Sequence, residues 1–206
     1  MITEHHITVP RTARYVMLGQ PGAHIKRLWY VLHGYGQLAE RFIREFERLD
    51  DGATLVVAPE ALSRSYLRGG SGTIGASWMT REDRLNEISD YLRYLTLLHA
   101  QLLQQLPSQP AITLLGFSQG AATAGRWLAS GAVAAHNLIL CGGLLPPEIT
   151  PEQLGQTTIT VVVGKEDQLV DRQALQQQRD ALQSAGKPLR VVEFEGGHRV
   201  SLEGVC

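Results

Sequence analysis

A pentapeptide at positions 116–120, Gly-Phe-Ser-Gln-Gly, most constrains what this chain can fold into. An apolar run at 111–115 precedes it, and a run rich in small residues follows it at 121–128. A strand, then G-x-S-x-G, then a closely packed helix is the pattern of a nucleophile elbow, whose glycines permit a turn that exposes a strained serine. In the alternative interpretation, Ser118 only caps the helix. The first interpretation predicts a serine hydrolase.

Size and charge limit the classes of protein to consider. The chain has 206 residues, so we expect a single domain over residues 1–206. With 19 basic and 20 acidic side chains, it has no basic field that would attract nucleic acid. Its two cysteines cannot build a disulfide framework. We see neither a signal peptide nor an apolar run long enough for a transmembrane segment, and therefore expect a cytoplasmic protein.

Apolar patterning predicts strands and helices that alternate along the chain. This alternation indicates an α/β fold with a mostly parallel central sheet and helices on both faces. Segments 3–9 and 13–18 flank a turn with proline, so we expect an antiparallel hairpin at the N-terminal edge of the sheet. Further strands are expected at 27–33, 53–59, 111–117, 137–141, 158–163 and 189–194, and helices at 38–50, 80–106, 119–130 and 171–185.

Between two of these elements lies a long segment without a regular pattern. Residues 63–79, within a loop over 61–80, hold four glycines. Loops of this length inside a domain are usually functional or disordered. The helix after the loop is expected to begin with Thr80 as its N-cap, because Thr80 and Asp83 fit a capping box.

A serine hydroxyl needs a base within hydrogen-bond reach and an acid that orients the base. In α/β-hydrolases the order along the chain is nucleophile, acid, histidine. Asp167 follows the strand at 158–163 and is the acid candidate. Its competitors are Glu166, which should point elsewhere, and Asp171, which suits the first turn of the next helix. Alternatively, Asp167 is an ordinary loop or capping carboxylate.

His198 is the candidate for the base. It follows two glycines at the end of the last expected strand, and these let the chain turn so that the imidazole reaches the sheet edge. The alternative is an ordinary surface histidine. His24, His99 and His136 lack a comparable setting. The adjacent His5 and His6 are interpreted as surface residues and not as metal ligands.

An oxyanion hole requires two backbone donors near the nucleophile. The residue after the nucleophile supplies one N–H, here that of Gln119. The second usually comes from the loop after the third strand, where His33-Gly-Tyr-Gly stands, and we select the N–H of Tyr35. His33 is expected to brace this loop rather than to transfer protons.

The order and spacing of these motifs resemble the phospholipase/carboxylesterase branch of the α/β-hydrolases. The matching segments are 32–36, 116–120, 164–167 and 197–198, which together span nearly the whole chain. The resemblance implies the α/β-hydrolase fold and hydrolysis of small carboxylic esters by a catalytic triad. It also implies no metal or organic cofactor, and a homodimer is compatible with it. The chain departs from the family in having Gln168-Leu-Val-Asp after the acid, where members usually have valine-proline, and in its short end after His198.

The resemblance further suggests that Trp78 lines the acyl side of the site, with Met79 beside it in a substrate-facing loop. Both could instead anchor that loop in the core, as large apolar residues usually do. Leu144, just after a strand end, is a candidate for the opposite wall or part of a packed exit loop. Two other functions stay open, a thioesterase acting on acyl-protein or acyl-coenzyme A and a non-catalytic binding protein with this fold.

Overall fold

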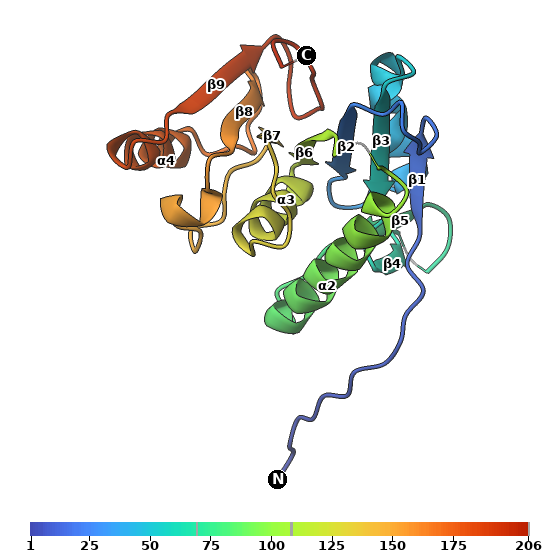
Figure 1. Cartoon of the computed structure of the whole chain (residues 1–206). Coiled ribbons are helices and arrows are strands. Elements are labelled where there is room, and N and C mark those ends of the chain that lie inside the picture. The colour runs from blue at the N-terminus through green and yellow to red at the C-terminus, as the bar shows by residue number, and fades with distance from the viewer. Residues whose placement is uncertain (69, 108, 206) are drawn as a thin grey trace.

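A single seven-stranded sheet forms the centre of the protein in the computed structural model (Figure 1). The structure describes residues 1–68, 70–107 and 109–205, so Gly69, Ser108 and the cysteine at position 206 lie outside the described residues. In spatial order the strands are β1 (Tyr15–Leu18), β3 (Thr54–Pro59), β2 (Arg27–Leu32), β6 (Ala111–Phe117), β7 (Asn137–Cys141), β8 (Thr158–Gly164) and β9 (Leu189–Phe194).

Within the described residues, β1 pairs antiparallel with β3, and the other neighbouring strands of this sheet are parallel. The mostly parallel sheet with an antiparallel edge is therefore as expected. The first arm of the expected hairpin is wrong, because residues 1–14 contain neither helix nor strand. Val16 and Leu18 pack on one face of the sheet and Tyr15 and Met17 on the other. Residues 1–12 are exposed and bury no side chains against the sheet, which explains why they add no strand.

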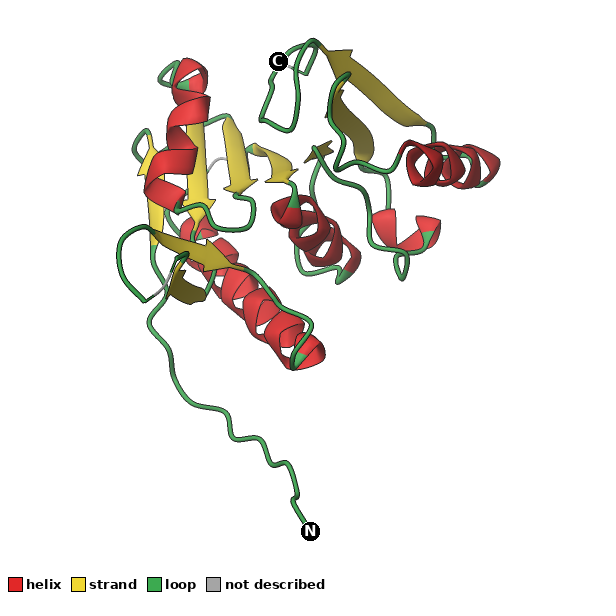
Figure 2. Cartoon of the chain, turned by 180° about the vertical axis from the view of Figure 1, so that it is seen from behind, coloured by secondary structure: helices red, strands yellow, loops and turns green. Residues whose placement is uncertain are grey.

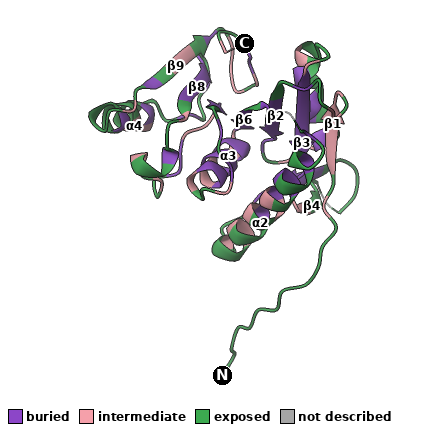
Figure 3. Ribbon diagram, viewed as in Figure 1, coloured by how far each residue is buried: buried purple, intermediate pink, exposed green. Residues whose placement is uncertain are grey.

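Helices cover both faces of the sheet, as the view from behind in Figure 2 also shows. They are α1 (Ala39–Phe42), the 3₁₀ helices η1 (Ile43–Leu49) and η2 (Pro151–Leu154), α2 (Arg84–Leu103), α3 (Gln119–Ala129) and α4 (Arg172–Ser184). Alternate residues of β2 enter two separate cores. Leu28 and Tyr30 join the core under α2, α3 and α4, whereas Trp29 joins the core under α1 and η1. The strands in the middle of Figure 3 are buried because helices cover both of their faces.

Two local expectations are corrected. The 63–79 segment is not irregular, because β4 (Ser63–Tyr66) and β5 (Ile74–Ser77) pair as a small antiparallel sheet. The helix α2 begins at Arg84 and not after Thr80, since the Thr80 backbone N–H and hydroxyl instead contact Oε2 of Glu87.

Among the described residues, no helix combines the length and apolar character needed to cross a membrane.

Candidate active site

Ser118 occupies a strained turn between β6 and α3. Its φ of 53° and ψ of −114° make it one of only two non-glycine residues with positive φ in the described part of the chain. Such a conformation persists only where the surroundings hold it in place. A Cβ at Gly116 would lie 2.1 Å from the backbone oxygen of Gly120, and one at Gly120 would lie 2.1 Å from that of Leu32. The two glycines are therefore required by close backbone contacts, as the pentapeptide predicts.

His198 and Asp167 form a direct contact at the same sheet edge. The imidazole Nδ1 lies 2.8 Å from Oδ2 of Asp167, whose side chain is 1% exposed. The other carboxylate oxygen accepts a hydrogen bond from the N–H of Leu169 at 2.9 Å. The competing carboxylates lie elsewhere, since Asp171 caps α4 and Glu166 is exposed. Of the three acidic candidates, Asp167 is the one that contacts the imidazole.

The imidazole of His198 lies beside Phe117 of the elbow and beside Gly142, the residue after β7. Its ring centroid is 4.8 Å from that of Phe117, the residue before Ser118. Gly142 leaves room for it, because a Cβ there would lie 3.1 Å from Cε1 of His198. The Ser118 hydroxyl makes no hydrogen bond to any described residue, His198 included. Contacts between a nucleophile and its base are often loose before they tighten around a substrate.

Two backbone N–H groups beside the elbow are available as donors. Neither the N–H of Tyr35 nor that of Gln119 donates to another residue in the described ranges. Gln37 supports the loop that carries Tyr35, because its Oε1 accepts the Gly34 N–H at 2.8 Å. Both N–H groups therefore remain without a partner among the described residues.

His33 braces this loop, as expected. It is fully buried, and its Nε2 accepts the N–H of Ala61 at 3.0 Å. Nδ1 must then carry the proton, which it donates to the Gly34 carbonyl at 2.8 Å. Burial lowers the pKa of His33 below its ordinary value, so the neutral ring is favoured.

Of the three candidate substrate contacts, Trp78 is buried in the core and the other two are half-buried. Trp78 is 2% exposed and donates its indole N–H to the His33 carbonyl at 2.8 Å, which fits the alternative of a core anchor. Its ring packs against Tyr91, with centroids 6.1 Å apart. Met79 and Leu144 are half-buried and pack against the larger core.

Sequence reasoning missed a buried carboxylate near the loop that carries Tyr35. Glu60, directly after β3, is 1% exposed and accepts two hydrogen bonds from Arg14, at 2.7 and 2.9 Å. It also accepts from Arg64 at 3.0 Å and from the N–H of Ala39 at the start of α1. Burial alone would raise the pKa of Glu60, but these donors hold it below its ordinary value. An acidic residue after a buried strand was the only signal for this cluster.

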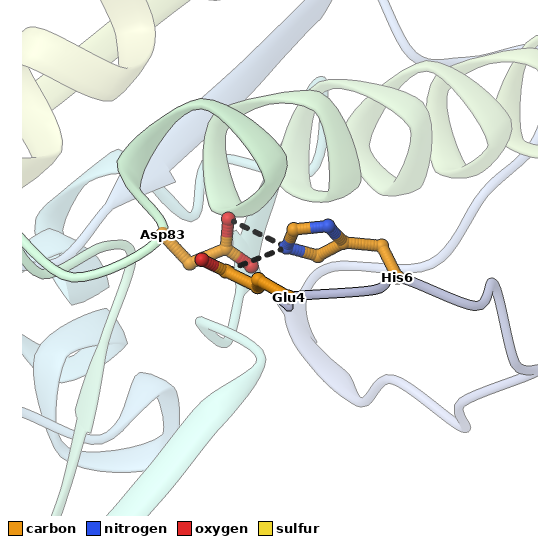
Figure 4. Close-up of side chains that lie close together, drawn as sticks. All are labelled: Glu4, His6 and Asp83. Carbon is orange, nitrogen blue, oxygen red and sulfur yellow. Dashed lines mark ion pairs between the residues drawn. The ribbon is translucent and has the colours of Figure 1, made fainter. Parts of the chain in front are cut away.

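A second cluster of polar side chains lies on the surface (Figure 4). Nε2 of His6 is 3.3 Å from Oε1 of Glu4 and 3.4 Å from Oδ1 of Asp83. All three residues are exposed, and they are the one group in the described chain whose ligand atoms lie close enough to hold a metal ion. Exposed pairs of this kind contribute little to stability. They connect the N-terminal tail to the start of α2.

Comparisons with known proteins agree with the fold described above. A protein-family model described as serine hydrolase (FSH1) matches residues 25–201. The fold is similar to that of esterase PE8, with 26% identity, a TM-score of 0.71 and 95% of each chain covered. It is also similar to acyl-protein thioesterase 2 from Zea mays (21% identity, TM-score 0.69, 94% of this chain and 95% of that chain). The Bacillus cereus carboxylesterase is a further similar structure (15% identity, TM-score 0.67, 94% of this chain and 90% of that chain). Comparison with curated proteins gives no match.

Proposed function

Because the chain belongs to the serine hydrolase (FSH1) family, we propose that it hydrolyses carboxylic esters with Ser118 as the nucleophile. His198 acts as the general base and Asp167 orients it. The observation that carries the proposal is the strained Ser118 at the sheet edge that also holds the His198–Asp167 pair. The α/β-hydrolase fold, shared with esterase PE8, supports it.

In the proposed reaction, the Ser118 oxygen attacks the ester carbonyl while Nε2 of His198 takes the hydroxyl proton. The protonated imidazole then gives this proton to the leaving alcohol as the carbon–oxygen bond breaks, which leaves an acyl group on Ser118. Water attacks that acyl-enzyme with the same base, releasing the acid and restoring the serine. Asp167 keeps the Nδ1 proton in place and stabilises the imidazolium.

The tetrahedral intermediate carries a negative oxygen in each half of the reaction. We propose that the N–H groups of Tyr35 and Gln119 bind it, since both lack another partner within the described residues. Donors that are already oriented stabilise such charge without reorganisation, and removing one of them typically costs about 2.7–4 kcal/mol of the barrier.

Turnover of p-nitrophenyl butyrate tests the proposal. Ser118→Ala is expected to lower kcat by at least about 10⁴-fold while the fold is retained. Ser89→Ala, which alters an exposed serine of α2, is the matched control and should keep full activity. Hydrolysis by Ser118→Ala at the wild-type rate would refute the nucleophile assignment.

The same assay with the butyryl thioester of equal chain length separates the two acyl chemistries, since one triad can cleave both bonds. A higher kcat/KM for the thioester would make the protein a thioesterase and correct the substrate class. If pure, folded wild-type protein turned over neither compound, a binding role on this fold would replace the enzymatic one.

A further inference from the structure

The side chain of Gln119 makes a paired contact that the proposed chemistry does not use. Its Oε1 accepts the backbone N–H of Trp78 at 2.9 Å, and its Nε2 donates to the carbonyl of Met79 at 2.7 Å. A primary amide offers one acceptor and donors side by side, which matches the N–H and C=O of successive residues. Ser77 adds only longer contacts to this amide, at 3.3 and 3.4 Å. Gln119 therefore connects the elbow to residues 76–79, which are the end of β5 and the two residues after it.

That same segment, residues 76–79, holds the loop that carries Tyr35. The Gly36 N–H donates to the carbonyl of Ala76 at 2.9 Å, and the Ala76 N–H donates to the carbonyl of Gln37 at 3.2 Å. On the other side of Tyr35, the indole of Trp78 donates to the His33 carbonyl at 2.8 Å. Residues on both sides of Tyr35 are thus hydrogen-bonded to the same segment as the Gln119 side chain.

Close backbone packing leaves this assembly little freedom. A Cβ at Gly75 would lie 2.4 Å from the carbonyl oxygen of Gly36, so β5 lies directly against the Tyr35 loop. A Cβ at Gly120 would lie 2.1 Å from the Leu32 oxygen, so the elbow lies directly against the end of β2. A displacement of segment 76–79 would accordingly move the Tyr35 loop relative to the elbow.

We propose that the carboxamide of Gln119 is a positioning group that sets the spacing between the two oxyanion donors. One donor is the N–H of Gln119 itself, and the other, that of Tyr35, is held through residues 76–79. The inference rests on the proposed function. It assigns the Gln119 side chain to transition-state stabilisation and not to substrate binding, so its loss should lower kcat and leave KM nearly unchanged.

The substitution Gln119→Glu tests the positioning role, because its effect on kcat should be reversed when the new acid is protonated. An ionised carboxylate still accepts from the Trp78 N–H but repels the Met79 carbonyl, whereas the protonated acid can donate to that carbonyl as the amide does. At about pH 8 we expect kcat to fall about 10–100-fold relative to wild type, the scale of a small misplacement of catalytic groups. As the pH falls to about 5, the ratio of variant to wild-type kcat should rise toward one.

Two further variants complete the experiment. Gln119→Met removes both hydrogen bonds, so its kcat ratio should be low at every pH. Gln177→Glu makes the same change on an exposed residue of α4 and should match wild type. Suppose that wild type hydrolyses the ester and Ser118→Ala does not. The proposed function then stands, but the positioning role is overturned if the ratio of Gln119→Glu kcat to wild-type kcat does not change with pH. It is also overturned if Gln119→Glu changes KM alone. If wild type does not turn over, both fall.

Discussion

Replacing Asp167 by asparagine should remove most turnover and little stability. One oxygen of Asp167 accepts the N–H of Leu169 at 2.9 Å, and the other faces Nδ1 of His198 at 2.8 Å. Asparagine keeps only one oxygen. Because the Leu169 N–H can only donate, the amide oxygen should stay there and the NH₂ group should face the imidazole. Nδ1 would then have to accept, and Nε2 would carry the proton and could not take one from Ser118.

The wrong tautomer of an otherwise intact triad lowers kcat by about 10⁴-fold, which corresponds to a barrier increase of roughly 5.5 kcal/mol. The substitution preserves shape and the contact with Leu169, so the loss of unfolding free energy should be about 1–2 kcal/mol.

The assay is kcat on p-nitrophenyl butyrate, with urea unfolding followed by circular dichroism on the same samples. Asp171→Asn is the matched control. Its carboxylate caps α4 by accepting from Gln173 and Ala174, and asparagine caps a helix about as well. If Asp167→Asn kept more than about a tenth of wild-type kcat, the assignment of Asp167 as the orienting acid would be wrong.

Three further perturbations test the fold around the site. Glu60→Gln should lower the unfolding free energy by roughly 3 kcal/mol at neutral pH, since it breaks a buried ion pair whose arginine partners stay partly hydrated. Because the folded pKa of Glu60 is depressed, this difference from wild type should shrink as pH falls below about 4, as urea titrations at several pH values would show. Burial lowers the pKa of His99, so the wild-type Tm should fall as pH drops below about 6.5, and His99→Gln should flatten that fall in calorimetry. Gly120→Ala places a Cβ 2.1 Å from a backbone oxygen and should prevent soluble expression, whereas Gly131→Ala, with open space at φ 73°, should cost only about 1–2 kcal/mol in thermal unfolding.

Features governed by local pattern could be predicted from the sequence. The run into Ser118 is apolar because β6 is buried on both faces, and its flanking glycines reflect backbone contacts shorter than a side chain allows. Asp167 follows the buried strand β8 and His198 follows the neighbouring parallel strand β9, and the carboxyl ends of parallel strands lie at one edge. Their contact therefore follows from chain order and topology.

Features that depend on contacts between distant segments could not be predicted in this way. Residues 3–9 alternate like a strand, but they find no core to cover. Trp78 could be assigned to a pocket or to the core with equal reason until its indole was seen bonded to His33. The partners of Glu60 and of the Gln119 amide lie on elements that no spacing rule connects, so neither role has a local signal.

Reaction with a fluorophosphonate tests the central claim most directly, because an activated serine oxygen attacks the phosphorus of the probe and displaces fluoride, which leaves a phosphonyl group on the serine. Treated wild-type protein should gain the mass of one adduct, and peptide mapping by mass spectrometry should locate it on Ser118. The Ser118→Ala variant should gain none. An unmodified wild-type protein that is shown to be folded, or an adduct on another residue, would contradict the account.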